Sequence, residues 1–211
     1  MYIKMEARYR AARVVSWKPQ TNSEENKMAQ VVDMVTNAAN QGHLRAQVNL
    51  GKIYRKGSGV AQDFKMATQW LHKAADQGCP EAQYNIGVMY HEGQGVPKNF
   101  KMSMQWLRKA ADQKFAEAQY SLGTMYCKGE GVVQDYSEAA RWYLKAADQG
   151  FAMAQLHLGN SYHLGQGVTR DFKKAIQWTR KAADQGCPEA QFNLGGMYDE
   201  GKGVAQDYNE A

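Results

Sequence analysis

Two kinds of amphipathic segment alternate along most of the chain. The first places apolar residues four, three and one positions apart, as at Ala82, Ile86, Met89 and Tyr90. The second has helical spacing at Phe64, Ala67, Trp70, Leu71 and Ala74. Because side chains three or four positions apart lie on one face of a helix, each segment is predicted to be a helix with one apolar face.

These two helices recur together with a period of 36 residues. The string Lys-Ala-Ala-Asp-Gln-Gly stands at residues 73–78, 145–150 and 181–186, and a near copy stands at 109–114. An Ala-Gln pair, a Gly, a Tyr, a Gly-x-Gly-Val turn and a Trp recur in the same phase. One helical hairpin cannot bury both of its faces, so the units are expected to stack and share one continuous core.

Glycine positions within the unit predict how the helices meet and end. A Gly in the middle of the first helix, such as Gly87, costs ~1 kcal/mol relative to Ala, so its recurrence predicts a second backbone too close for a β-carbon. The paired glycines are expected to end this helix through a left-handed cap. Five residues are predicted to cap the second helix with a side-chain oxygen, namely Asp63, Asn99, Asp135, Asp171 and Asp207.

The 36-residue register divides the chain into three parts. Residues 1–23 are predicted to be a basic N-terminal extension, and residues 24–42 a degenerate second helix that caps the stack. Residues 43–211 hold the five units, with bounds 43–78, 79–114, 115–150, 151–186 and 187–211. The last unit stops at Ala211, before its Trp, so we expect either that the natural protein continues or that an apolar face is left uncapped.

The net charge of +5 lies mostly at the N-terminus, where residues 1–27 carry six Lys or Arg and three Asp or Glu. The remaining residues hold 20 bases and 18 acids, which argues against nucleic-acid binding because it gives no contiguous basic face. No stretch has the ~18 to 20 apolar residues of a membrane-spanning helix, and no secretory signal is visible, so the expected location is the cytoplasm. The alternative for residues 1–23 is a basic amphipathic helix that targets an organelle or a membrane surface.

The residues that could carry chemistry form no recognisable site. Cys79, Cys127 and Cys187 follow no metal-binding spacing, and the first and third should lie ~30 Å apart in a stack, so all are expected to be free thiols. Only His157 and His163 lie close in sequence, and a separation of six positions places them on different sides of a helix. The Gly-x-Gly turns lack the Lys-Ser/Thr of phosphate loops. We therefore predict no catalytic residue, no metal and no cofactor.

In its recurring residues the chain resembles the Sel-one-like repeat family, which is related to tetratricopeptide proteins. The resemblance covers about residues 43–211 and all five units. It implies an all-α, right-handed α-solenoid superhelix of antiparallel helix pairs, used as a non-enzymatic scaffold or adaptor that binds other proteins. One branch of the family is secreted and has a disulfide in every unit, and this chain departs from it because no cysteine has a partner in its own unit.

The resemblance also predicts which side chains line the concave face. Aligning the mid-helix Gly with its tetratricopeptide counterpart selects positions that vary between units, from which we predict partner contacts by Val48, Lys52, Arg55, Tyr84, His91, Tyr120, Leu156, His163 and Phe192. The apolar members would form a stripe, with Lys52, Arg55 and Lys56 at its positive N-terminal end. The expected partner is an extended or helical peptide with apolar anchors and an acidic end. The alternative is that the rings pack between helices.

Three other functions remain open from the sequence. The chain could be a bacterial effector or envelope-associated protein that binds a host or cell-wall component. An enzyme of the β-lactam-binding type is disfavoured because no Ser-x-x-Lys motif occurs. The basic extension could instead bind a membrane or a nucleic acid in a salt-sensitive way. The oligomeric state is not predicted.

Overall fold

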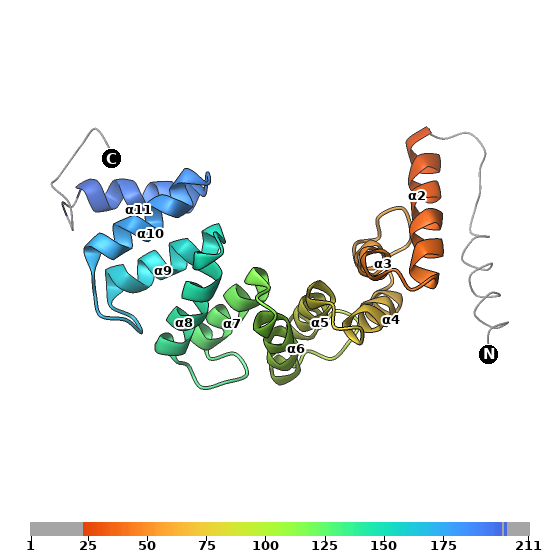
Figure 1. Ribbon diagram of the computed structural model, residues 1–211, viewed down its shortest axis with the longest axis horizontal. Coiled ribbons are helices and arrows are strands. Elements are labelled where there is room, and N and C mark those ends of the chain that lie inside the picture. Colours follow the sequence, from red (N-terminus) through yellow and green to blue (C-terminus); the bar gives the residue numbers. More distant parts are fainter. Residues whose placement is uncertain (1–22, 200, 202–211) are drawn as a thin grey trace.

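The computed structural model describes residues 23–199 and 201, in which the regular elements are ten helices. They are α2 (Ser23–Asn40), α3 (Leu44–Lys56), α4 (Phe64–Ala75), α5 (Pro80–Glu92), α6 (Phe100–Asp112), α7 (Ala116–Lys128), α8 (Tyr136–Asp148), α9 (Ala152–Leu164), α10 (Phe172–Asp184) and α11 (Pro188–Asp199). Consecutive helices pack against each other along an arc (Figure 1). The predicted all-α solenoid of helix pairs is thus confirmed. Residues 1–22 of the predicted basic extension and the predicted cap Asp207 lie outside the described residues.

The helices begin and end at the residues that the sequence predicts. Asp63 accepts a hydrogen bond from the backbone N of Met66 at 2.9 Å, and the equivalent residues cap α6, α8 and α10 in the same way. Gly57 has a φ of 71° and donates its backbone N–H to the carbonyl of Ile53. Such left-handed glycine caps also end α5, α7 and α9, so the connection between the two helices of a unit is the same each time.

The mid-helix glycine marks the closest contact within a unit. A β-carbon on Gly87 would lie 2.8 Å from Cγ of Leu107 and 3.3 Å from the backbone N of Leu107. The equivalent glycines of the other complete units face the same position of the second helix, occupied by Leu71, Tyr143 and Thr179. The predicted close approach is confirmed, but its nearest atoms belong to this side chain rather than to the backbone.

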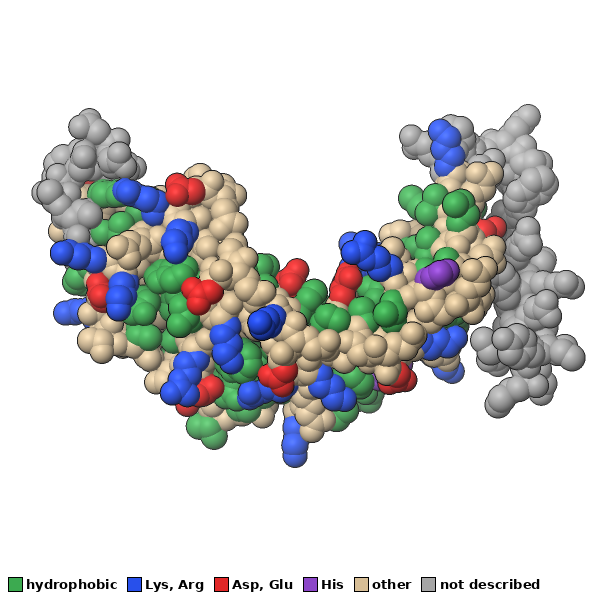
Figure 2. Space-filling model, in the orientation of Figure 1, with side chains coloured by type: hydrophobic (Ala, Val, Ile, Leu, Met, Phe, Trp, Pro, Cys, Tyr) green, Lys and Arg blue, Asp and Glu red, His purple; other side chains and the backbone are tan. Residues whose placement is uncertain are grey.

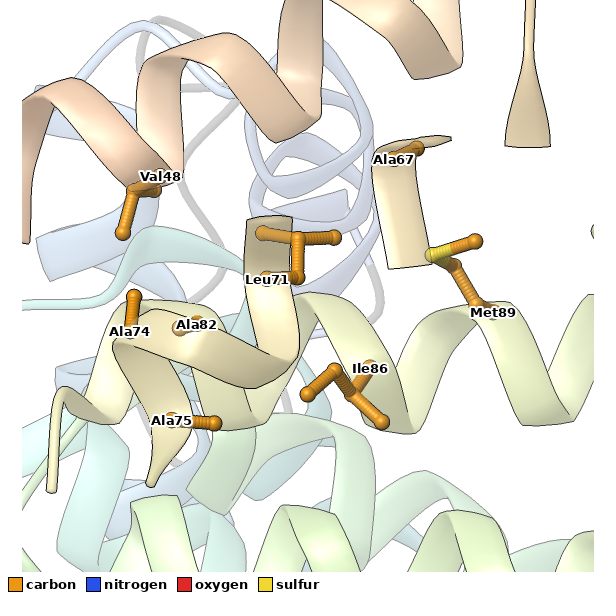
Figure 3. Close-up of a cluster of buried hydrophobic side chains, with 8 residues drawn as sticks. All are labelled: Val48, Ala67, Leu71, Ala74, Ala75, Ala82, Ile86 and Met89. Atoms are coloured by element: carbon orange, nitrogen blue, oxygen red, sulfur yellow. The ribbon is translucent and has the colours of Figure 1, made fainter. Parts of the chain in front are cut away.

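The hydrophobic core continues from one unit into the next. Figure 3 shows one stretch of it, built from α3, α4 and α5 by Val48, Ala67, Leu71, Ala74, Ala75, Ala82, Ile86 and Met89. Since α3 and α4 belong to one unit and α5 to the following one, the two units share this core. The buried alanines let the helices approach closely around the larger side chains.

A ladder of buried glutamine amides links the units. Nε2 of Gln83 donates to the carbonyl of Ala75 in the preceding unit at 3.4 Å, and its Oε1 accepts from Nε2 of Gln113 at 2.9 Å. The same two bonds recur at Gln47, Gln119 and Gln155. The Ala-Gln pair recurs with the 36-residue period because a buried amide is favourable only when its donor and acceptor are both bonded.

The tryptophans are less uniformly buried than the sequence predicts. Trp70 and Trp142 are 5% and 3% exposed, whereas Trp106 and Trp178 are only partly buried. The ammonium of the lysine three positions later lies over each tryptophan ring, 3.7 to 4.1 Å from the ring centre. The tryptophan row therefore borders the surface, where a lysine can cover a ring and keep its charged end in water.

Helix α2 lies in the segment predicted to cap the stack. Its Ala39 packs with Leu50 of α3 and Trp70 of α4, as the alanines of later second helices pack on the following unit. Met34, at the Trp position of the repeat, is 70% exposed. Among the described helices, none is long and apolar enough to cross a bilayer.

Candidate functional site

A pocket of about 240 Å³ opens between the first helices of units two and three. Helix α5 contributes Tyr84, Val88 and His91 to its lining, and α7 contributes Tyr120 and Thr124. All five are at positions that the sequence predicts to face the concave side. Figure 1 shows α3 and α5 toward the hollow side of the arc, and Figure 2 shows charged and apolar side chains mixed along that side. We refer to this cavity as the α5–α7 pocket.

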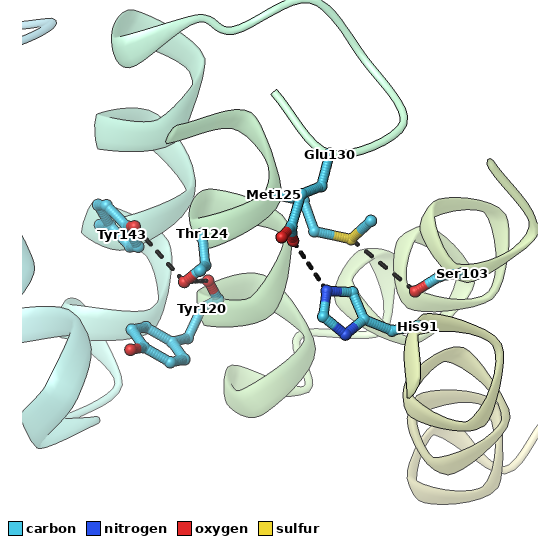
Figure 4. A network of polar contacts seen from close by, with 7 residues as sticks. All are labelled: His91, Ser103, Tyr120, Thr124, Met125, Glu130 and Tyr143. Atoms are coloured by element: carbon cyan, nitrogen blue, oxygen red, sulfur yellow. Dashed lines mark hydrogen bonds and ion pairs between the residues drawn. The ribbon is translucent and has the colours of Figure 1, made fainter. Parts of the chain in front are cut away.

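Two tyrosines of the pocket lining are partly buried between consecutive first helices, and of their rings that of Tyr84 lies at the α5–α7 junction while that of Tyr120 points into the following one (Figure 4). The ring of Tyr84 lies 5.4 Å from that of Phe115, and the ring of Tyr120 lies 5.3 Å from that of Phe151. Burial raises the pKa of both tyrosines, and a hydrogen bond with Ser121 offsets part of that rise for Tyr84. Each ring thus packs on the next unit, as the alternative interpretation expects, and the partner contacts of these two residues stay a prediction.

The predicted apolar stripe is not continuous. Val48 and Leu156 are 1% and 4% exposed, so as core residues they cannot present an apolar surface on the concave face. At this position a short aliphatic side chain is covered by the second helix of its own unit and by the next unit, whereas a tyrosine is only partly buried. Phe192 is 84% exposed, and the described residues contain no further helix to cover it.

The positive charge predicted at the N-terminal end of the groove is partly neutralised. The ammonium of Lys52 forms an ion pair with the carboxylate of Glu81 in the next unit. Arg55 is partly buried, and its charge acts on Tyr84, where it opposes the rise in pKa that burial causes. An acidic end of a ligand would therefore meet less positive charge than the sequence suggests.

The structure pairs His91 with an acid that the sequence analysis missed. Nε2 of His91 lies 2.8 Å from Oε2 of Glu130, which belongs to the Gly-x-Gly turn after α7 (Figure 4). The imidazole also packs on Phe100, with ring centres 5.2 Å apart. Because these turns were interpreted only as punctuation, their middle residue was not considered. This middle residue varies between units, and it is Ser58, Gln94, Glu130 and Gln166 in units one to four. That variation was the signal by which Glu130 could have been found.

The equivalent His163 has different surroundings. Its ring packs edge-on against Phe172 at 5.4 Å, and its Nδ1 is buried with no hydrogen-bond partner among the described residues. It does not join His91 or His157 in one site. No group of three His, Cys, Asp or Glu side chains in the described part of the chain is arranged to hold a metal ion, and the three cysteines are free.

A second aromatic cluster fills the space between units three and four. We call Tyr120, Thr124, Tyr143 and His157 the Tyr120 cluster. The hydroxyl of Tyr120 lies 3.2 Å from Nε2 of His157, whose ring stacks on Tyr143 at 5.2 Å. Tyr143 donates to Oγ1 of Thr124, which donates to the carbonyl of Tyr120 (Figure 4). These contacts occupy the place that a pocket has one unit earlier.

Titration in the Tyr120 cluster is governed by burial. Burial raises the pKa of Tyr143 far above its ordinary value, and it lowers the pKa of His157, with the charge of Lys128 as a second, smaller cause. The imidazole of His157 and the phenol of Tyr143 are therefore both neutral near pH 7, so neither supplies a charged group for catalysis. The roles of Tyr143 and His157 were missed, because His157 was considered only as a possible metal ligand.

Comparison with known proteins identifies the repeat. The model of the Sel1 repeat matches residues 44–79, 80–115, 116–151, 152–187 and 188–211. The chain belongs to the Sel1 repeat family. Proteins of this family are generally non-catalytic scaffolds for protein interactions. The resemblance predicted from the sequence is thereby confirmed.

Several solved structures are similar. A protective antigen of uropathogenic Escherichia coli strains with an SLR fold has 44% identity and a TM-score of 0.82, and a Sel1 repeat protein from Oxalobacter formigenes has 35% and 0.79. The matches cover 87% and 89% of this chain, but 39% and 74% of those proteins. Helicobacter pylori cysteine rich protein B has 26% identity and a TM-score of 0.52, over 63% of this chain and 96% of its own. No curated protein matches the sequence.

Proposed function

We propose that this protein binds an extended segment of a partner protein along its first helices, with one anchoring side chain in the α5–α7 pocket. The observation that supports the proposal is the pocket itself. It is lined by residues that vary between units, whereas the other contacts of these two units recur along the repeat. Sel1 repeat proteins are generally interaction scaffolds, which gives the class of partner.

The pocket has the size expected for one side chain. Small-molecule and cofactor sites in proteins span ~300 to 1,000 Å³, and this cavity of about 240 Å³ is smaller. Its floor is formed by Leu107 and Met125, which are both buried. An anchoring side chain inserted from a peptide would cover this floor, while the rest of the peptide would follow the groove.

The tyrosines supply much of the expected binding energy. Tyrosine offers a broad apolar face and a hydroxyl at a low cost in side-chain entropy, and it is enriched in binding hot spots. Phe115 and Phe151 already restrain the rings of Tyr84 and Tyr120 in the free protein. Little further ordering is therefore needed when a partner binds.

Replacing both tyrosines tests the proposal. Peptides selected from a random display library on the wild-type protein should bind the Tyr84→Ser/Tyr120→Ser variant at least tenfold more weakly, a loss of ~1.4 kcal/mol or more. The matched control is Tyr136→Ser, which removes an exposed tyrosine of α8 outside the pocket and should leave affinity unchanged. If the double variant is folded and binds the peptides with wild-type affinity, the proposed site is wrong.

The proposed location remains the cytoplasm, where the three free thiols would stay reduced. A host-facing role is the second candidate, favoured by the similarity to the protective antigen of uropathogenic strains. The chain spans only 39% of that protein's length, so the similarity supports this role indirectly. Protease treatment of intact cells separates the two, since only a surface-exposed protein would be digested.

A further inference from the structure

Two carboxylates stand at the rim of the α5–α7 pocket. Glu92 ends α5 and is exposed, and it forms no ion pair within the described residues. Glu130 is on the opposite side, in the turn after α7, where its contact with His91 fixes it beside the pocket. The pocket thus combines an apolar floor with two acidic groups.

The negative charge of Glu92 acts on Tyr84, an aromatic residue of the pocket lining. Burial is the main cause of the raised pKa of Tyr84, and the negative charges of Glu117 and Glu92 raise it further. Of the two rim acids, Glu92 is therefore the one whose charge reaches the phenol, and its effect is smaller than the opposing effect of Arg55. A cation entering the pocket would meet the charge of Glu92 together with the tyrosine ring.

Two basic residues oppose the charge of the acids. Lys128 also lines the pocket, but its charge acts on His157, which lies on the α9 side. Arg55 acts on Tyr84 from the preceding unit. Around the cavity itself, the carboxylates of Glu92 and Glu130 face Lys128, and His91 contacts one oxygen of Glu130, so a positively charged side chain fits better than a negative one.

This pair of acids is found at one junction of the repeat. The residues equivalent to Glu92 are Lys56, Lys128 and Leu164 in units one, three and four, and those equivalent to Glu130 are Ser58, Gln94 and Gln166. Among the described units, no other junction carries acids at both of these positions. The fold does not require them, because neutral or basic residues occupy the same positions elsewhere.

Guanidinium chemistry matches the pocket more closely than ammonium chemistry does. A guanidinium is planar, stacks on aromatic faces and donates two parallel hydrogen bonds to one carboxylate. Its aliphatic stem can cover the apolar floor while its charged end remains at the rim. An ammonium offers a point charge without the stacking surface.

We propose that the α5–α7 pocket selects an arginine side chain of the bound segment, which stacks on Tyr84 and bonds to Glu92 and Glu130. The inference rests on the proposed function, since it names the anchor of that same site. It replaces the apolar anchor that the sequence predicts at this part of the groove with a cationic one.

Blocked host–guest peptides of the form acetyl-Gly-Ala-X-Ala-Gly-amide provide the test. The guest X is arginine, its neutral isostere citrulline, lysine or norleucine, and binding is followed by NMR shifts of residues 84–92 and 120–130. The arginine peptide should bind at least tenfold more tightly than the citrulline peptide, and more tightly than the lysine peptide. Because arginine and citrulline are matched in shape, the ratio of their affinities reports the contribution of the guanidinium charge.

Variants drawn from the repeat itself supply the protein side of the test. Glu92→Lys and Glu130→Gln introduce residues that other units carry at these positions, so folding should be preserved. Together they should bring the arginine-to-citrulline ratio close to one. The control Glu138→Gln, which neutralises a carboxylate paired with Arg141 on α8, should leave the ratio unchanged.

The outcomes separate the inference from the proposed function. If arginine, citrulline and norleucine peptides shift the pocket signals with equal affinity, the pocket is an apolar anchor site and the arginine inference is wrong. Equal binding of lysine would contradict the guanidinium preference. If no guest shifts these signals, both the inference and the proposed function fail.

Discussion

The junction between units two and three and the junction between units three and four have the same fold but different contents. At the first, Tyr84 lies beside Ser121 and faces a pocket with an acidic rim. At the second, Tyr120 occupies the equivalent position, but His157 fills the space beside it and stacks on Tyr143. The repeat therefore builds the same groove twice, and its own side chains close one copy.

The difference shows which residues the fold dictates and which it leaves free. The glutamine ladder, the glycine caps and the alanine contacts recur at both junctions. Ser121 and His157 are equivalent residues, and Asn49, Asn85 and Asn193 occupy that position in the other units. His157 in place of Ser121, together with Tyr143 in place of Leu107, thus distinguishes the filled junction from the open one.

The largest effect is expected when the filled junction loses its central ring. Tyr143 is 2% exposed and contacts Gly123, Tyr120 and His157, so Tyr143→Ala should destabilise the protein by ~3 to 5 kcal/mol. Tyr143→Leu introduces the residue that units one and two have at this position and should restore most of the stability. Chemical denaturation measures both. A loss below about 1 kcal/mol for the alanine variant would contradict the assigned packing.

The open junction should be closed by the residue that fills its neighbour. Ser121→His places an imidazole beside Tyr84, as His157 lies beside Tyr120. Affinity for library-selected peptides should fall at least tenfold, or ~1.4 kcal/mol, with little change in melting temperature. Isothermal titration calorimetry checks the affinity, and Ser137→His on the exposed start of α8 is the control. Unchanged affinity in a folded Ser121→His variant would show that the ligand does not enter this pocket.

A smaller effect is expected on acidification. Burial and the charge of Lys128 lower the pKa of His157 in the folded protein, so the unfolded chain binds this proton more readily than the folded one. The stability that neutral His157 confers is therefore complete above its ordinary pKa of 6.5 and is lost as the pH falls through the lower, folded-state value. Denaturation curves of wild type and His157→Asn between pH 7.5 and about pH 5 should converge on acidification. If the free energies of unfolding of the two proteins differ by the same amount at every pH, His157 does not contribute to the pH dependence of stability.

Much of the fold follows from the sequence because its determinants are local and repeated. Gly87, the caps such as Asp63 and the Ala-Gln pair each have one physical role, and the 36-residue period presents that role several times. Trp106 is the exception in this scaffold. It is only partly buried although Trp70 and Trp142 at the same position are buried, a difference that the period alone does not specify.

The site was less predictable because it depends on contacts between particular units. The structure places Tyr84 and His91, two of the positions that the family alignment selects, at the pocket, but it buries Val48 and Leu156, which the alignment treats alike. Which side chain stays partly exposed at this position depends on its length, because valine and leucine are short enough to be buried and tyrosine is not. Glu130 comes from a turn of another unit, 39 positions from His91, so no local pattern joins the two.

Mapping a bound peptide onto the backbone tests the central claim most directly. A peptide selected on the wild-type protein should be titrated into the ¹⁵N-labelled chain, and amide shifts followed by NMR. We predict the largest shifts in residues 84–92 and 120–130, with those of α6 and α8 smaller except beneath the pocket floor. Shifts confined to α4, α8 and α10, with none around Tyr84, would contradict the assignment of the binding site to the α5–α7 pocket.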